Sequence, residues 1–359
     1  MKFVSKLLTR RGSSGSLWNK NPKPCTPGLA RYRQAFATSG AKNDPTDAGL
    51  LLELVRTHRD RLRAWQPDDA LTRQLRLLVE HRRRTVADRT RLTALLKTYF
   101  PQALGWAGDL RSAAACEFLT FWPTLEAVEQ ARRSALRRFY HDHRRPSAEE
   151  LGQLFQQIDH AQPLTRDRAL VEASALMAQT LAWQFQAVTA SLDRLDQALK
   201  ELFNQHPDQE LFNNLPGAGK ALAPRLAAAF GSDRHRFQNA EELQQFSGVA
   251  PVTEASGKMH WVHWRMACPG FLRQTFHEFA AASTHRSLWA RAYYDRRRQH
   301  GASHHSAVCA LAYKWIRILY RCWQTHTPYD EKLYLEALGR RRSPLWIAAA
   351  ISSTQEARS

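Results

Sequence analysis

A run of apolar residues near the middle of the chain constrains the fold more than any other feature. Its members are separated alternately by four and three positions: Leu181, Phe185, Val188, Leu192, Leu195, Leu199 and Leu202. Because a helix turns about every 3.6 residues, this spacing places all of them along one side of a single long helix. It predicts a coiled coil or an antiparallel helical pair over residues 166–210, although the core-facing stripe of one amphipathic helix shows the same spacing.

Helical spacing of apolar residues continues through most of the chain. A helix is expected to begin at Asp44, because Asp is a favourable N-cap, Pro45 suits the first helical position and Asp47 stabilises the first turn. Further long helices are expected over residues 69–99, 271–283, 288–299 and 306–323. Prolines break residues 102–165 into shorter helices, and turn formers over 248–266 allow only short strands. The predicted fold class is therefore mainly α.

The charge of the chain restricts the class of partner. Its 359 residues include 52 Lys and Arg against 33 Asp and Glu, a formal net charge of +19. Such an excess favours a polyanion, either nucleic acid or an anionic membrane surface. No apolar stretch approaches the ~20 residues of a membrane-spanning helix, and the N-terminus lacks the apolar segment of a signal peptide. We therefore expect a cytoplasmic protein that binds nucleic acid and no membrane. The scattered cysteines fit neither a zinc site nor a disulfide framework.

The first 43 residues differ in composition from the rest. They contain nine Lys or Arg, no Asp or Glu, and many Gly, Ser and Pro residues. This composition predicts a basic, disordered arm, for which a solvated tail is the simplest interpretation. The expected organisation continues with a helical region over 44–165, the coiled coil over 166–210, a C-terminal domain over 211–340 and a tail over 341–359.

Two short acidic and glycine-rich motifs are candidate binding sites. Asp44 and Asp47 share one face of a helical turn, where two carboxylates can ligate Mg²⁺ with water completing the shell. The same pair is equally explained as a cap and a first-turn acid. In the segment PGAGK, the N–H groups around Gly217 and Gly219 and the ammonium of Lys220 can hold a phosphate of a nucleic-acid backbone. A plain turn explains this segment as well.

A third motif offers a candidate nucleophile, and several basic clusters offer candidate phosphate contacts. In EASGK, Ser256 lies between Gly257 and the preceding residues of a turn, where it can act as an exposed nucleophile beside Lys258. Taken alone, this segment also reads as an ordinary turn. The remaining phosphate-contact candidates are arginines among aromatic residues or in short runs: Arg265, Arg296, Arg297, Arg298 and the run 340–342. Most of the interleaved aromatic residues are expected to lie in the core.

Together these segments resemble a known family. AKNDPTDA, the heptad segment, LPGAGKALAPRLAAAFG, FQNAEELQQFSGVAPVTEASGK and FLRQTFHEFA follow one another as in DEDD-type insertion-sequence transposases of the one-hundred-and-ten group. The resemblance covers about residues 29–338. It implies a RuvC-like N-terminal domain of the ribonuclease-H-like α/β type, a coiled-coil middle and a helical C-terminal transposase domain with a helix-hairpin-helix-like element.

The resemblance also implies an activity and roles for individual residues. Such transposases cut and join DNA strands during transposition. Asp44 and Asp47 match the last two carboxylates of the DEDD set, which holds Mg²⁺, and Ser256 matches the serine regarded as the nucleophile on DNA. Family members act as homo-oligomers whose metal site and serine come from different protomers. Some of them use a structured guide RNA to choose DNA sites.

This chain departs from the family pattern in its first residues. The family's first Asp and its Glu precede the AKNDPTDA segment, whereas here no Asp or Glu precedes Asp44 and no strand-like segment is evident there. We therefore expect a truncated RuvC-like domain that is defective in catalysis. The alternative is a catalytically inactive remnant that only binds nucleic acid. A stand-alone metal nuclease is a third hypothesis, and it is weakened by having only two carboxylates.

Overall fold

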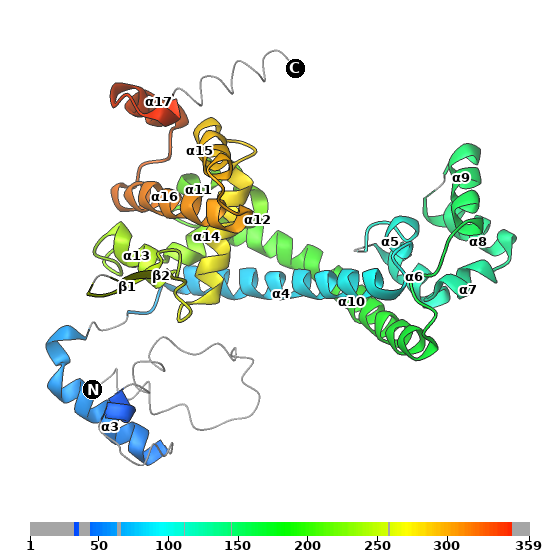
Figure 1. The fold of residues 1–359 in the computed structure, drawn as a ribbon, viewed down its shortest axis with the longest axis horizontal. Helices are drawn as coiled ribbons and strands as arrows, with labels where there is room; N and C mark the ends of the chain where they lie inside the picture. Colours follow the sequence, from blue (N-terminus) through cyan, green and yellow to red (C-terminus); the bar gives the residue numbers. More distant parts are fainter. Residues whose placement is uncertain are drawn as a thin grey trace. The chain divides into compact units, whose positions relative to one another are not determined.

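The computed structural model describes residues 32–35, 44–62, 66–110, 112–144, 146–257 and 259–346, except for the side chains of Arg89 and residues 185–193. These residues form mainly helices, as predicted (Figure 1). The chain packs as two compact units, unit 1 with Met1–Arg76 and Leu202–Ser359 and unit 2 with Leu77–Glu201. Most of the predicted arm over 1–43, most of the tail over 341–359, and Lys258 lie outside the described residues.

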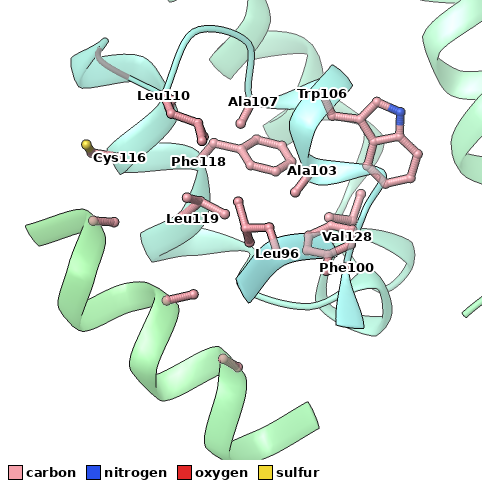
Figure 2. Close-up of a cluster of buried hydrophobic side chains, with 14 of the residues drawn as sticks. Leu96, Phe100, Ala103, Trp106, Ala107, Leu110, Cys116, Phe118, Leu119 and Val128 are labelled. Atoms are coloured by element: carbon pink, nitrogen blue, oxygen red, sulfur yellow. The ribbon is translucent and has the colours of Figure 1, made fainter. Parts of the chain in front are cut away.

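Unit 2 contains short helices and parts of two long ones. The elements are α4 (Ala70–Tyr99), α5 (Ala103–Trp106), α6 (Ala113–Phe121), α7 (Leu125–Glu129), α8 (Arg133–His143), α9 (Ala148–Asp159) and α10 (Arg168–Asn204). Side-chain caps at Ser112, Thr124 and Ser147 fix where three of the short helices begin. Their apolar faces enclose one core in which Phe100, Phe118 and their neighbours are buried (Figure 2).

The predicted long helix over 166–210 is present as α10. Within unit 2, α4 and α10 lie side by side, joined by Arg82 Nε and Asp196 Oδ1 at 2.5 Å. Leu92 of α4 and Leu181 of α10 belong to the same buried cluster, so part of the stripe packs within the chain. The coiled coil remains a prediction, because the stripe's central side chains belong to residues 185–193, which the structure does not describe.

Unit 1 contains one short helix near the start of the chain and a helical domain near its end. The elements are α3 (Asp44–Thr57), η1 (Arg59–Arg61), α11 (Gln209–Asn213), α12 (Gly219–Phe230), α13 (Ala240–Phe246), β1 (Val252–Ser256), β2 (Met259–His263), α14 (Gly270–Ser283), α15 (Leu288–Gln299), α16 (His304–Thr325) and α17 (Glu331–Arg340). The predicted helices over 271–283, 288–299 and 306–323 correspond to α14, α15 and α16. Within the described residues, β1 and β2 form the one sheet.

Tryptophan side chains hold the C-terminal helices together. Trp289 of α15 and Trp315 of α16 are fully buried with ring centroids 4.7 Å apart. The indole N–H of Trp315 donates to Ser283 Oγ at 2.8 Å, and that of Trp289 donates to the Tyr329 hydroxyl at 2.8 Å. These hydrogen bonds satisfy the polar atoms that burial of the two rings removes from water.

A buried polar cluster fastens the start of α4 to the end of α10. Asp68 Oδ1 accepts hydrogen bonds from Arg236 Nη2 at 2.6 Å and from the Ser232 N–H at 2.9 Å. The His206 ring is buried, with Nε2 3.1 Å from Thr72 Oγ1 and Nδ1 accepting from the Asp208 N–H at 3.1 Å. An accepting Nδ1 requires the proton of the neutral ring to be on Nε2.

Two parts of the predicted fold class, the RuvC-like sheet and the helix-hairpin-helix-like element, remain predictions. Residues 44–62 and 66–110 form helices and loops in the structure, so a RuvC-like sheet remains a prediction. The helix-hairpin-helix-like element also remains a prediction, although α11, a turn and α12 follow one another at PGAGK. No helix among the described residues is both long and apolar enough to cross a membrane.

Candidate functional site

Ser256 is the last residue of β1, at the closed end of the hairpin. β1 and β2 pair antiparallel, with Ser256 opposite Met259 and Glu254 opposite Trp261. Gly257 follows Ser256 with φ of +57°, a left-handed conformation that favours glycine and that tight hairpin turns require. The sequence Ser-Gly-Lys therefore places the hydroxyl beside a sharp turn, where the side chain is exposed to solvent.

The hairpin around Ser256 exposes large apolar side chains. Met259 is 77% exposed, Trp261 63% and Trp264 48%. In the pairing register, Met259 and Trp261 lie on the same face of the hairpin as Ser256, because directly opposed residues point to one side. An isolated two-stranded hairpin is marginally stable in water, so this surface is suited to contact a further molecule.

Neither histidine of the hairpin is placed to act as a base for Ser256. His263 pairs with Val252, four residues and about 13 Å along the strand from Ser256. Its Nε2 lies 3.0 Å from Glu254 Oε1, and this hydrogen bond raises the pKa of the His263 ring. His260 pairs with Ala255 and therefore points to the opposite face.

A cavity of about 810 Å³ opens at the base of the hairpin, and we call it the hairpin cavity. Its walls come from the end of β2, from α15 and from the first half of α16. Aromatic and basic side chains line it: Trp264, Tyr293, Arg297, His305 and Tyr313. Aromatic rings can stack on unpaired bases and a guanidinium can hold a phosphate, so the cavity is suited to part of a single nucleic-acid strand.

Sequence reasoning missed this cavity. The signal was present in SLWARAYYDRRR and YKWIR, where aromatic and basic residues alternate. The expectation that most of these aromatic residues lie in the core is confirmed for Trp289 and Trp315, which are fully buried. Tyr293 and Tyr313 are only partly buried and line the cavity instead.

The turn at PGAGK combines a packing role with an accessible surface. Gly217 has φ of +82°, and a Cβ atom there would lie 2.7 Å from the Ala282 carbonyl oxygen of α14, so only glycine fits. Gly219, with φ of +55°, has open space around its Cα, and Lys220 is exposed at the start of α12. Pro224 lies inside α12, which begins at Gly219 and not at the proline.

The predicted basic residues lie in different surroundings. Arg296, Arg297 and Arg298 form the exposed last turn of α15, where cations also complement the helix dipole. Arg297 lines the hairpin cavity, whereas Arg298 donates to the Ala302 carbonyl at 2.7 Å. Arg265 is half-buried behind the hairpin, and its carbonyl accepts a hydrogen bond from Arg273.

Asp44 and Asp47 lie in the first turn of α3, as the sequence predicts. Arg33, in the helical segment 32–35, donates through Nε to Asp47 Oδ1 at 2.9 Å, and its Nη2 lies 2.6 Å from the same oxygen. Among the described residues, no group of three or more His, Cys, Asp or Glu side chains is placed to hold a metal ion. This turn therefore offers a metal ion two carboxylates, of which Asp47 also pairs with Arg33, and further ligands would have to come from elsewhere.

Comparison with known proteins gives two matching families. Residues 209–295 match the model described as "Transposase IS116/IS110/IS902 family", and residues 24–102 match the DEDD_Tnp_IS110 transposase model. The "Mini-circle putative transposase for IS117" of Streptomyces coelicolor is 31% identical over 334 residues, which is 89% of this chain and 78% of the relative.

More distant relatives share smaller parts of their sequence with the chain. The "Insertion element IS900 uncharacterized 42 kDa protein" of Mycobacterium paratuberculosis is 28% identical, over 84% of this chain and 77% of the relative. The "Pilin gene-inverting protein" of Moraxella bovis is 25% identical over 50% of this chain and 58% of the relative. Both the segment with Asp44 and Asp47 and the segment with Ser256 lie inside matched regions.

Proposed function

The chain belongs to the IS116/IS110/IS902 family of transposases, and we propose that Ser256 is its nucleophile on DNA. It is the transposase of an insertion sequence, which cuts and joins DNA strands during transposition. These relationships do not favour the alternative hypothesis, an inactive remnant that only binds nucleic acid. We therefore propose an active enzyme in place of the defective one that the sequence predicts. The proposal for Ser256 names the residue that would attack the DNA backbone in this reaction.

The exposed position of Ser256 at the hairpin turn is the observation that carries this proposal. Its Oγ would attack the phosphorus of a phosphodiester, forming a new P–O bond while the bond to the leaving sugar oxygen breaks. The hydroxyl proton passes to a base, and the leaving oxygen takes up a proton. The resulting phosphoserine retains the ester bond, so attack by another strand's hydroxyl joins DNA without an external energy source.

The nucleic-acid contacts that we propose surround the hairpin and the α11–α12 turn. Backbone N–H groups near Gly217 and Gly219, with the exposed ammonium of Lys220, would hold one phosphate. Four further arginines and one lysine are the proposed contacts nearer the hairpin: Arg265, Arg296, Arg297, Arg298 and Lys258. The net charge of +19 supports this assignment, because phosphate neutralisation dominates affinity for DNA.

A divalent metal is typical of DEDD transposases, and we propose Mg²⁺ with Asp44 and Asp47 as two of its ligands. When bound, such a cation neutralises charge on a phosphodiester under attack. The remaining ligands must come from water, from DNA phosphates or from residues outside this turn. We also propose that the chain acts as a homo-oligomer and that a structured guide RNA contributes to the choice of DNA sites. The exposed apolar hairpin supports association, and the positive charge supports RNA binding.

Covalent trapping tests the role of Ser256. A labelled DNA duplex with a nick beside the cleavage site loses the short fragment needed for rejoining, so a phosphoserine adduct accumulates and shifts the protein on a denaturing gel. We expect the adduct in the parent chain and its complete loss in Ser256→Ala. Thr253→Ala is the matched control, because Thr253 is exposed on the same strand and points to the opposite face. Undiminished adduct in Ser256→Ala would show that another group is the nucleophile.

A further inference from the structure

A second basic groove lies between α16 and α17, orange and red in Figure 1. This groove has a volume of about 800 Å³ and shares no lining residue with the hairpin cavity. Its α17 wall is anchored, because Glu331 Oε1 accepts hydrogen bonds from Ser287 Oγ and the Leu288 N–H, both at 2.9 Å. We call it the α16–α17 groove.

Cations line the α16–α17 groove from both helices: Lys314, Arg317, Arg321, Arg340 and Arg341. Those on α16 are spaced by three and four positions, so they share one face over about 10 Å of the helix axis. In the part of the chain that the structure describes, none of the five forms an ion pair. The one acidic side chain of the groove, Asp330, caps α17 by accepting from the Leu333 N–H at 3.1 Å.

The cations are close enough to repel one another. Burial and the neighbouring Arg317 guanidinium both lower the pKa of Lys314. Burial raises the pKa of Tyr334, whereas Arg341 and Arg317 act against this rise, so cations from both helices converge on one phenol. Without an anion in the groove, this concentration of positive charge is destabilising.

The residue after the end of α17 also indicates that positive charge is favoured beside the α16–α17 groove. Arg342 has φ of +48°, and the Ser343 N–H donates to the Leu338 carbonyl at 3.0 Å, as in helix ends that usually carry glycine. A side chain is less favourable than glycine in this conformation. The dipole of α17 favours cations at its C-terminus, but it does not account for the cations in the middle of α16.

We propose that the α16–α17 groove binds the phosphodiester backbone of a nucleic-acid strand. The interval of about 10 Å on α16 equals the rise of about three nucleotides along the axis of a duplex, at ~3.4 Å each. Apolar side chains between the cations, among them Ile318 and Leu333, are suited to pack against sugars. The groove would give the transposase a second nucleic-acid site besides the hairpin face. This inference rests on the chain acting on nucleic acid, and it is independent of chemistry at Ser256.

The test compares a groove variant, which lacks two exposed cations of the groove, with a control variant that lacks two exposed cations outside it. Arg317→Gln with Arg321→Gln removes two of the three cations on the α16 face without touching the core, since both side chains are exposed. Arg286→Gln with Lys332→Gln removes the same charge at exposed positions that do not line the groove, one of them on α17 itself. Binding of labelled duplex DNA, single-stranded DNA and a folded RNA hairpin is measured over a series of salt concentrations.

We expect the groove variant to bind at least one probe about tenfold more weakly, with the salt slope reduced by about two, and the control variant to lose much less. The probe that loses affinity identifies the strand type that the groove holds. Equal affinities and slopes for the groove variant, the control variant and the parent chain would overturn the proposal. The adduct assay at saturating DNA separates the two proposals, because the groove variant should still form the adduct and Ser256→Ala should still bind.

Discussion

Trp315 and Trp261 lie in the same unit, but their surroundings are opposite. Trp315 is fully buried on α16, its N–H satisfied by Ser283 and its ring 5.1 Å from that of Phe279. Trp261 is 63% exposed on the hairpin, and its described ring contact is with His263 at 4.9 Å. The helical scaffold therefore buries the Trp315 ring and pairs its N–H, whereas the hairpin leaves the Trp261 ring exposed for another molecule.

This contrast separates stability from function within one domain. Buried rings and the hydrogen-bonded indoles of Trp289 and Trp315 hold the helices α14, α15 and α16 together. The hairpin carries Ser256 and contributes little buried surface of its own. Substitutions in the helices should consequently lower the free energy of unfolding, whereas substitutions in the hairpin should weaken DNA binding or association.

The largest effect on stability is expected from Trp315→Ala. Removing this buried ring leaves a cavity and removes the hydrogen bond from the indole N–H to Ser283 Oγ, which should lower the free energy of unfolding by about 4 kcal/mol. Trp261→Ala should change it by less than about 1 kcal/mol and should instead weaken DNA binding or association. Urea unfolding followed by circular dichroism measures both. A comparable loss of stability in the two variants would remove the distinction between scaffold and hairpin.

A smaller effect is expected from Asp68→Ala. This substitution removes the carboxylate oxygen that accepts hydrogen bonds from the half-buried Arg236 guanidinium and from the Ser232 N–H, at a cost of about 3 kcal/mol. Asp60→Ala is the control, because Asp60 is exposed and should be neutral within about 0.5 kcal/mol. Thermal unfolding of both variants decides whether the scaffold depends on this polar cluster as well as on its aromatic core. Equal melting temperatures for the two variants would exclude such a dependence.

The smallest effect is expected from pH, acting through His206. Burial lowers the pKa of this ring despite the neighbouring carboxylates of Asp208 and Asp69. The unfolded chain therefore binds the proton more readily, so the contribution of His206 is complete above about pH 6.5 and is lost as pH falls below it. His206→Gln should flatten the slope of unfolding free energy between about pH 6.5 and pH 5. An unchanged slope would assign the acid sensitivity to other groups.

The sequence predicts single helices and turns of this molecule better than sites that tertiary packing forms from distant segments. Helices such as α4 and α15 follow from the period of their apolar residues and the capping residues around them, and the hairpin turn follows from Gly257. The hairpin cavity could not be predicted, because its lining residues lie in α13, at both ends of the hairpin, in α15 and in α16, and only the packing of three helices brings these segments together. The spacing also cannot distinguish an aromatic ring that faces the core from one that faces a cavity.

The same limit applies to the candidate catalytic residues. Asp44 and Asp47 were placed on one helical turn from their spacing, and α3 confirms this. The ion pair of Asp47 with Arg33 could not be predicted, because it depends on how the helical segment 32–35 packs against α3. For Ser256, the turn was predictable, but the position of His263, four residues along the strand, followed only from the strand register.

The ion pair between Arg33 and Asp47 makes cation binding at α3 an exchange reaction. Any metal ion that coordinates Asp47 Oδ1 competes with a guanidinium held 2.6 Å away, so apparent metal affinity is reduced by the stability of that pair. Displacing Arg33 also releases a positive charge next to the site, where a DNA phosphate can take the place of the carboxylate as its counter-ion. Metal and DNA would then bind cooperatively, because each would offset part of the free energy needed to break the Arg33–Asp47 ion pair for the other. The residues that contact them would not change.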